Sequence, residues 1–332
     1  MKYNINLYLF DVNTNLNKTT SAATGNDLSP EMQTFYDTSL LQNERKKHYF
    51  TQFGQTQPLP KGNGKRVTWR RFDSFKPALT PLTEGVTPDG NKLNMQSIGK
   101  DVEQYGDYTA VSDRLQSEAI DPVISVCTEE HGAQAGDTLD TIVRNEVVSG
   151  TNVFYAGDKT SRAALTATDK VTPQLFHRVA VFLKKQLAPL KDGTYIAIIH
   201  PSVAYDLTES EGWIEAHKYA TPENIYNGEI GKLYNIRFVE DPTMKVYNGN
   251  GSDVLAVYAT IVMGAEAYRI IDPNDEGLRM IVKMAGTGGT SDPLEQRSTV
   301  GWKACQAAKI LYQERIVRVE SCATDSLIDV AN

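Results

Sequence analysis

Histidine and cysteine are two residue types that often bind metal ions or take part in nucleophilic catalysis, so their spacing is considered first. They are His48, His131, His177, His200, His217, Cys127, Cys305 and Cys322. The cysteines form no CxxC pair, and the histidines lack the spacing of two helical zinc ligands. We therefore expect no metal site, no disulfide framework and no cofactor, with inert thiols and with histidines that are structural or exposed.

Two short motifs resemble ligand-binding loops but lack a required residue. Gly64-Lys65 could belong to a phosphate-binding loop only with glycine at position 59 and Ser or Thr at position 66, and the chain has Leu59 and Arg66 there. The run that begins at Asp272 opens like a calcium-binding EF-hand loop, but its last ligand position holds Lys283, which cannot bind calcium. Neither motif predicts a bound ligand.

Composition excludes several classes of protein. The chain has 332 residues, of which 40% are apolar and 23% charged, as in an ordered globular protein. Its formal net charge of −7 disfavours a freely diffusing nucleic-acid binder. No stretch approaches the roughly 20 apolar residues of a membrane span, and Leu7–Phe10 is too short for the core of a signal peptide. We expect a soluble protein that is made in a cytoplasm and is not an enzyme.

A Ser-His-Asp hydrolase that acts as a monomer stays open as an alternative, because the members of such a triad need not be neighbours in sequence.

A basic cluster lies between positions 61 and 71. It consists of Lys61, Lys65, Arg66, Arg70 and Arg71 around Trp69. Basic residues interleaved with an aromatic residue can hold nucleic acid. On an acidic chain, pairing with acidic residues of a neighbouring copy is favoured over nucleic acid and over simple solvation.

Local patterns divide the first half of the chain into an arm, a hairpin and a long helix. Residues 1–27 are polar, rich in Asn and Thr, and have no helical or strand period, whereas Ser29-Pro30 is a typical helix start. Strands are predicted at Arg66–Phe72 and Val102–Val111, with a long connection that can bury little by itself, so we expect an extended hairpin. Residues Asp121–Ser149 have the apolar spacing of one helix of roughly 40 Å, which suits an elongated spine.

Residues 171–295 are predicted to form a compact α+β unit. Helices are expected from Thr172-Pro173 onward, at Val203–Leu207 and at Trp213–Tyr219, and strands at Tyr195–Ile199, Ile236–Val239, Val254–Ile261, Tyr268–Ile271 and Met280–Val282. Two final strands near Thr299–Tyr312 and Arg315–Glu320 are expected to pair with each other and to pack on the long helix.

Several motifs in this sequence resemble those of phage-N4-type major capsid proteins. They are Leu28–Met32, Trp69–Phe72, Leu82–Pro88, Val102–Tyr108, Ala135–Asp140, Ile230–Glu240 and Ser298–Lys303. They occur in order from residue 28 to residue 303 and therefore cover most of the chain. In this resemblance, the residues before Ile236 form a helix-to-strand corner. The first 27 residues have no counterpart.

The resemblance implies the HK97-like major capsid fold, which belongs to the α+β class. Its parts are an N-terminal arm with the first helix at 1–50, an extended loop at 51–113, a peripheral domain with the spine helix at 114–170, an axial domain at 171–292 and return strands of the peripheral domain at 293–332. The implied function is self-assembly as hexamers and pentamers into an icosahedral or prolate head shell around double-stranded DNA, in the cytoplasm of a bacterial host. The implied partners are further copies and a portal, with either a separate scaffolding protein or none, and with decoration proteins as a further option. The alternatives are an encapsulin-like compartment shell and another virion component.

The resemblance also suggests which residues would meet between copies. On the extended loop these are Trp69, Arg70, Arg71, Phe72 and Glu84, and on the spine of a neighbour they are Glu129, Glu130 and Asp137. A loop with Lys245, Tyr247, Asn248 and Asn250 is expected at the symmetry axes. No catalytic, cofactor-binding or metal-binding residue is expected.

Overall fold

The structure is a computed structural model, and it describes residues 48–60, 64–87, 89–119, 122–213, 229–248, 255–273, 277–287, 293–324 and 329–332. The chain divides into two units, Met1–Glu44 and Arg45–Asn332, and all described residues belong to the second. The predicted arm, the helix from Ser29, most of the helix Trp213–Tyr219 and the predicted axial residue Asn250 lie outside the described residues.

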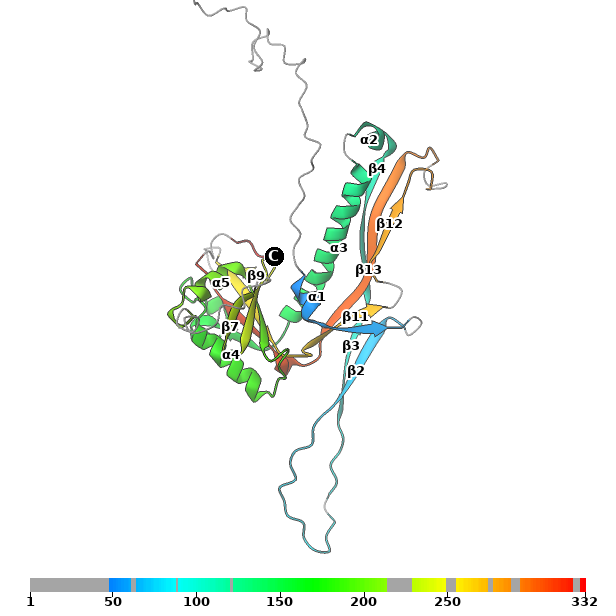
Figure 1. Cartoon of the computed structure of the whole chain (residues 1–332). Helices are drawn as coiled ribbons and strands as arrows, with labels where there is room; N and C mark the ends of the chain where they lie inside the picture. The colour runs from blue at the N-terminus through cyan, green and yellow to red at the C-terminus, as the bar shows by residue number, and fades with distance from the viewer. Residues whose placement is uncertain are drawn as a thin grey trace, which may run out of the picture. The chain divides into compact units, whose positions relative to one another are not determined.

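A seven-stranded sheet forms one half of the Arg45–Asn332 unit. Its order is β5-β14-β10-β6-β8-β7, and β9 pairs with the start of β10. The strands are β5 Val153–Tyr155, β6 Tyr195–Ile199, β7 Glu229–Leu233, β8 Ile236–Glu240, β9 Val246–Asn248, β10 Ala256–Met263 and β14 Ile316–Ser321. The helices α4 Pro173–Lys185 and α5 Pro201–Thr208 belong to the same half (Figure 1). Most helices and strands predicted between residues 171 and 263 are present here within a few residues of their expected bounds, whereas the predicted strands Tyr268–Ile271 and Met280–Val282 belong to the other sheet.

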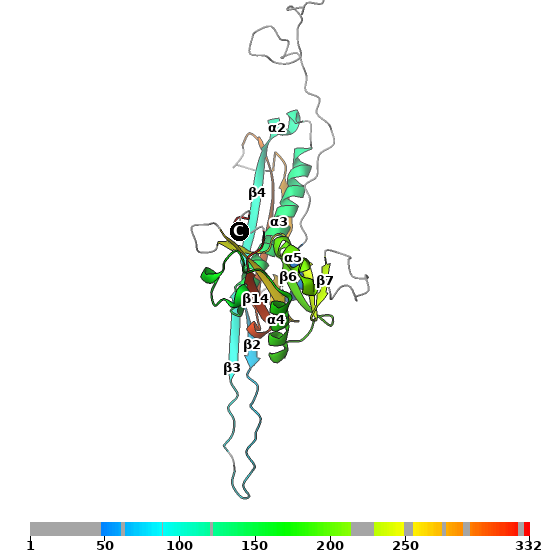
Figure 2. The ribbon, with the colours of Figure 1, turned by 90° about the vertical axis from the view of Figure 1, so that its left-hand side faces the viewer.

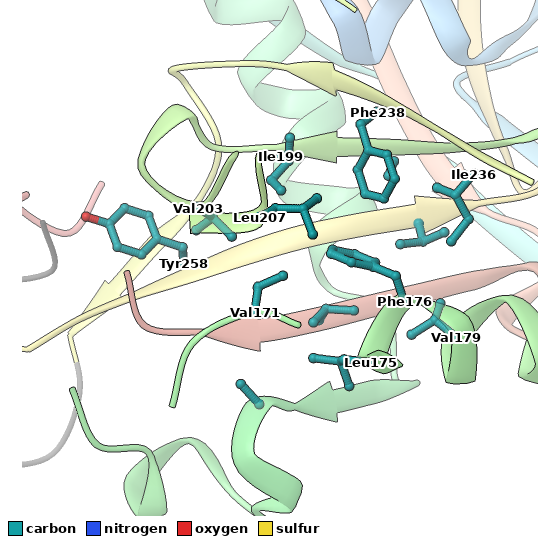
Figure 3. Packing of buried hydrophobic residues seen from close by; sticks show 14 of the residues in the cluster. Val171, Leu175, Phe176, Val179, Ile199, Val203, Leu207, Ile236, Phe238 and Tyr258 are labelled. Atoms are coloured by element: carbon teal, nitrogen blue, oxygen red, sulfur yellow. The ribbon is translucent and has the colours of Figure 1, made fainter. Parts of the chain in front are cut away.

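The core of this half is built by the apolar period of α4 and the continuous burial of β6. Thr172 caps α4 by accepting a hydrogen bond from the backbone N–H of Leu175, and Pro173 fits the first helical turn. The ring of Phe176 then packs edge-to-face on Phe238, with ring centres 4.8 Å apart. All five residues of β6 are buried, so both faces of the sheet are covered at this strand. Figure 3 shows Phe176 and Phe238 among the residues that fill this core.

A five-stranded sheet and the long helix α3 form the other half. The strands are β1 Gln55–Leu59, β4 Glu103–Ser112, β11 Tyr268–Pro273, β12 Arg279–Lys283 and β13 Arg297–Ile310. β13 pairs with β11 near its end, and with β4 on one side and β12 on the other nearer its start. The helix α3 covers Val123–Val148, as predicted, and packs on β13. Ala135 of α3 and Trp302 of β13 are buried against each other, and the Trp302 indole N–H donates to Gln134. The short helices α1 Tyr49–Phe53 and α2 Asp113–Glu118 complete this half.

The expectation that the two final strands pair with each other is wrong. β13 lies in the five-stranded sheet, whereas β14 lies between β5 and β10 in the seven-stranded sheet. β14 is almost entirely buried, so its backbone N–H and C=O groups need partners on both edges. The 3-10 turn Gln313–Arg315 carries the chain from one sheet to the other. The two sheets also do not follow the predicted segments 171–292 and 293–332. β11 and β12 come from the first segment but join the five-stranded sheet, and β14 comes from the second but joins the seven-stranded sheet.

The hairpin is present, but its return strand differs from the prediction. β2 Arg66–Phe72 pairs antiparallel with β3 Met95–Asp101, from Arg66 opposite Asp101 to Phe72 opposite Met95. The predicted return strand Val102–Val111 corresponds instead to β4, which pairs along β13. The backbone N–H of Val102 donates to Lys65 O at 2.8 Å and closes the hairpin at its base. Both views show the hairpin running away from the remainder of the Arg45–Asn332 unit (Figures 1 and 2).

The helix-to-strand corner expected before Ile236 is also different. Residues Glu229–Leu233 form the strand β7, which pairs antiparallel with β8. Tyr234 and Asn235, between these strands, both have positive φ, at 49° and 70°. Two residues with positive φ give the tight turn whose twist matches paired strands. The corner is therefore a β-hairpin.

Gly301 of β13 is required by the close approach of β4. A Cβ atom at this position would lie 2.6 Å from Tyr108 Cβ and 2.7 Å from Asp107 O. We expect Gly301→Ala to lower the free energy of unfolding by about 1–3 kcal/mol through overpacking. Gly132→Ala on α3, where a Cβ meets nothing within 4 Å, should instead raise it by up to about 1 kcal/mol. Urea unfolding of the unassembled subunit measures both, and equal effects would contradict the packing argument.

Candidate assembly surfaces

The connection between β2 and β3 has apolar side chains that the described residues of this chain leave exposed. Its ends are joined by a hydrogen bond from Asp73 N to Asn94 O, and its tip turns through the bond from Val86 N to Thr83 O, both at 3.1 Å. Leu79 and Leu82 have 87% and 78% of their surface exposed. Phe75, Val86 and Leu93 are also exposed. Exposed apolar surface of this extent is typical of a site that another protein surface covers.

The base of the hairpin is fixed to the rest of the unit through β2. The Arg71 guanidinium donates two hydrogen bonds to the Glu314 carboxylate, at 3.1 and 3.4 Å, and the Trp69 indole N–H donates to Gln57 at 2.6 Å. The hydrogen bond with Glu314 raises the pKa of Arg71, and the same bond lowers the pKa of Glu314. Arg71, which was predicted to meet acids of a neighbouring copy, therefore has an acidic partner in its own chain.

Reversing the charge of Arg71 is expected to loosen the hairpin base without unfolding the protein. Arg71→Glu places two carboxylates together, but the pair is partly exposed, so the cost is only about 0.5–1 kcal/mol. We expect faster hydrogen exchange of the β2 and β3 amides near Phe72 and recovery in the double variant R71E/E314R. Arg70→Glu is the matched control, because Arg70 is exposed and points to the other face of β2. Equal hydrogen exchange of these amides in R70E and R71E would show that the Arg71–Glu314 pair does not anchor the hairpin.

The other strand of the hairpin is tied to the spine helix by Glu146. The two carboxylate oxygens of Glu146 on α3 accept hydrogen bonds from Lys309 of β13 at 2.8 Å and Lys100 of β3 at 3.3 Å. Burial by itself raises the pKa of Glu146, but the two lysines outweigh it, and the net pKa is lowered. One carboxylate thus joins the hairpin, the helix and the five-stranded sheet.

The ion pairs of Glu146 with Lys100 and Lys309 should weaken in acid. Because the folded-state pKa of Glu146 lies below its usual 4.5, the ionised carboxylate stabilises the fold above that value, and this stability is lost as the pH falls through the lower folded-state pKa. We expect Glu146→Gln to reduce the free energy of unfolding by about 1–2 kcal/mol at pH 7 and to flatten its decline between about pH 5 and pH 3. Urea unfolding at several pH values measures both. The exposed Glu118→Gln is the control, and an unchanged pH profile in E146Q would exclude Glu146 as the cause.

The acids predicted to meet the basic strand lie on the spine helix α3. Glu129 and Glu130 are exposed on α3, and Asp137 on the same helix lies 3.8 Å from His48. Phe72 and Glu84 are exposed on the hairpin and its connection. The structure brings none of these acids to Arg70 or Arg71. Their contact between copies stays a prediction.

The residues predicted for an axial loop are partly in a strand. Tyr247 and Asn248 belong to β9, which pairs with β10, and Lys245 precedes it. The guanidinium of Arg162 lies over the Tyr247 ring at 3.5 Å. Tyr247 is therefore fixed inside this half of the unit, and the expectation of a free loop there is wrong for Val246–Asn248.

Two of the histidines make hydrogen bonds to nearby groups of the described chain. His131 bonds Thr109 and Gln134, and His200 Nδ1 accepts from the N–H of Ser202 at the start of α5. The three cysteines are free thiols, and burial raises the pKa of Cys322 to about 11. Within the described residues, no cluster of His, Cys, Asp or Glu suits a metal ion. None of the described helices combines the length and apolar character of a membrane span.

Comparison with known families decides which class of protein this is. A sequence profile of the phage capsid protein family matches residues 96–308, which is well over half of the chain. The chain belongs to the phage capsid protein family. It is a major capsid shell protein with a structural role in the virion, where copies associate to form the shell. No curated protein matches its sequence.

Solved capsids show the fold of this capsid protein. The capsid of Ralstonia phage GP4 matches with a TM-score of 0.69 at 16% identity, over 92% of this chain and 98% of that one. The capsid of cyanophage P-SCSP1u matches with a TM-score of 0.67 at 14% identity, over 90% and 96%. The mature capsid of bacteriophage PhiM1 matches with a TM-score of 0.65 at 11% identity, over 92% and 96%. The fold is therefore HK97-like, as the sequence resemblance implied.

Sequence analysis did not identify the residues that anchor the hairpin of this capsid protein. Glu314, Glu146 and Lys309 hold the hairpin, yet each lies far along the chain from its partner. No local motif marks them, because an ion pair between distant residues leaves no periodic signal. Only the excess of basic residues on β2 indicated that an acidic partner was needed.

Proposed function

We propose that this capsid protein builds a phage head shell as hexamers and pentamers in which the connection of each hairpin lies over a neighbouring copy. The observation that carries this is the exposed apolar surface between β2 and β3, which has Leu79 and Leu82 near its tip. Side chains of this kind are stabilised when another surface removes them from water, at roughly 25 cal/mol per Å². A shell supplies such a surface on every adjacent copy.

The wall of such a shell would enclose double-stranded DNA without reading its sequence. The net charge of −7 supports this, because an acidic wall limits adhesion of the genome. The family match favours a phage head over an encapsulin-like compartment. The motifs Trp69–Phe72 and Leu82–Pro88 support the finer assignment to the phage-N4-type coat proteins. We further propose assembly in the host cytoplasm, with a portal and with separate scaffolding and decoration proteins, and no catalysis.

The structure changes one of the contacts that the sequence predicted between copies. Arg71 is bonded to Glu314 in its own chain, so Arg70 is the basic residue of this pair that we propose for the acids Glu129, Glu130 and Asp137 of a neighbour. Glu84, Trp69 and Phe72 remain proposed contact residues on the hairpin. Arg70→Glu should therefore reduce assembly while leaving the hairpin base intact.

The test is electron microscopy of the protein expressed alone and purified by size exclusion. Closed shells, or pentameric and hexameric rings, are expected. Because a scaffolding protein can be required, a monomeric result is followed by co-expression with the products of the neighbouring genes. A monodisperse monomer in both experiments, at high concentration, would overturn the proposal.

A further inference from the structure

The strand β12 has an open edge that is unusually apolar. In the described part of the chain it pairs with β13 alone, at the end of the five-stranded sheet. All five of its residues are exposed. From Leu278 to Met284, five large apolar side chains each expose more than a third of their surface: Leu278, Met280, Ile281, Val282 and Met284. Such an edge offers unpaired backbone groups and apolar side chains, which natural proteins usually protect with proline, charge or a bulge.

The edge has two chemically distinct faces. Met280 and Val282 lie opposite the buried residues Trp302 and Val300 of β13, so they share the face that α3 covers. Arg279, Ile281 and Lys283 point to the other face. A partner strand that fits must therefore bring apolar or aromatic residues to the helix face and a negative charge near Arg279 or Lys283.

A second copy of β12 does not meet these requirements. In an antiparallel pair of two β12 strands centred on Ile281, Arg279 of one copy would lie opposite Lys283 of the other. Like charges directly opposite each other destabilise a strand pair. The occupant must therefore be a different segment.

The arm contains one segment with the required pattern. Residues Ile5–Val12 read Ile-Asn-Leu-Tyr-Leu-Phe-Asp-Val, which is rich in aromatic and branched residues and ends near an acid. One antiparallel register satisfies both faces of β12: Leu278 opposite Val12, Arg279 opposite Asp11, Met280 opposite Phe10, Ile281 opposite Leu9, Val282 opposite Tyr8 and Lys283 opposite Leu7. It pairs opposite charges and places both aromatic rings over the helix face.

The length of the arm allows this segment to reach another subunit. Residues 13–47 separate it from His48, where the described chain begins. At up to about 3.3 Å per residue, this linker can extend over roughly 115 Å. In a shell, copies lie side by side, so the arm of one copy can reach the sheet of the next.

We propose that the open edge of β12 in each copy accepts residues Ile5–Val12 of a neighbouring copy as an antiparallel strand. The main-chain hydrogen bonds would supply affinity, and the Arg279–Asp11 pair with the aromatic contacts would set the register. This inference rests on assembly into a shell. Its test is therefore performed on particles that have already formed, so that a failure of strand addition is separate from a failure of assembly.

The test is disulfide crosslinking between two singly substituted chains. Asp11→Cys and Arg279→Cys proteins are co-assembled, with differently sized tags, and oxidised as particles. Because each chain carries only one of the new cysteines, a D11C–R279C heterodimer can form only between copies. Single-variant particles measure the background from Cys127, Cys305 and Cys322. We expect the heterodimer to be the main crosslinked product.

Lys303→Cys is the matched control for position. Lys303 is exposed and lies directly opposite Arg279 in β13, so D11C would be two strands away, at about 9–10 Å, beyond the roughly 7 Å limit for a disulfide. We expect at least about tenfold less heterodimer with K303C. Equal crosslinking to R279C and K303C, or none to R279C in intact particles, would overturn strand addition. Crosslinking of D11C to Lys283→Cys instead would overturn the antiparallel register.

A second variant tests the apolar part of the proposal. Leu9→Asp places a charge opposite Ile281 and should reduce the D11C–R279C heterodimer severalfold in particles that still form. Asn13→Asp, just beyond the proposed strand, adds the same charge and should leave the yield unchanged. If L9D crosslinks as well as the parent pair, the contact is not the proposed strand.

Discussion

Replacing residues Asp73–Asn94 by the dipeptide Asn-Gly is expected to abolish shell formation while leaving the subunit folded. Phe72 and Met95, at either end of this segment, already lie opposite each other in the hairpin. Asn-Gly is the preferred two-residue turn between such strands, so the register of β2 and β3 is preserved. Apart from partly buried Asp73, the described residues of the segment are exposed, and their loss removes almost no buried surface from the chain itself.

Electron microscopy and urea unfolding together check this prediction. We expect an unchanged unfolding midpoint and no closed particles, even with scaffolding partners present. A second variant keeps the full length of the connection but replaces Leu79 and Leu82 by serine. It tests whether the apolar side chains, rather than the length of the connection, are needed, and it should also assemble poorly. Normal shells from the Asn-Gly variant would show that the connection is dispensable, and the proposed overlap of copies would then be abandoned.

Glu320→Ala is expected to have the largest effect on the stability of the subunit. Glu320 of β14 is fully buried, and its carboxylate accepts hydrogen bonds from Arg162 at 2.6 and 2.7 Å and from Arg318 at 2.8 Å. The alanine variant leaves two guanidinium groups without their anion, one of them stacked on Tyr247. Removal of one partner from a buried ion pair costs about 3–5 kcal/mol. That is a large share of the roughly 5–15 kcal/mol that holds a typical domain folded.

The measurement is the urea unfolding midpoint of the unassembled subunit. Glu118→Ala is the matched control, because the Arg114–Glu118 pair is exposed on both sides and should be worth at most about 0.5 kcal/mol. Glu320→Gln keeps the volume and some hydrogen bonds, so it should fall between the two. A loss below about 1 kcal/mol in E320A would mean that water or other groups replace the carboxylate.

Local periodicity predicted those elements whose burial is decided within the element. α3 and α4 have apolar residues at helical spacing. β6 is a continuous apolar run, β10 is apolar except for Thr260, and both strands are fully buried. β3 gave no such signal. Its sequence, Met-Gln-Ser-Ile-Gly-Lys-Asp, has neither alternation nor strong strand formers, and it is a strand because β2 supplies its hydrogen bonds.

Pairing between distant segments could not be predicted in the same way. The expected pairing of the last two strands failed because neighbours in sequence need not be neighbours in a sheet. β14 is almost entirely buried, so its backbone groups need partners on both edges. Of the proposed contact residues on the hairpin, Arg70 and Phe72 are exposed on β2, Glu84 is exposed in the connection, and Trp69 and Arg71 are partly buried. Their contacts between copies stay a prediction. The partner of Arg71 was missed, because Glu314 is 243 residues away in sequence.

The sequence by itself determined the α+β class, the long helix, the presence of an extended hairpin and, through ordered motifs, the resemblance to phage coat proteins. These depend on the period of apolar residues and on short local patterns, which the chain carries wherever it folds. Only the tertiary structure decided which strands share a sheet, which carboxylates hold the hairpin and Arg162, and that β12 is left as an open edge. Those outcomes depend on burial and charge pairing between residues far apart in sequence, and such energies exist only once the chain has brought the residues together.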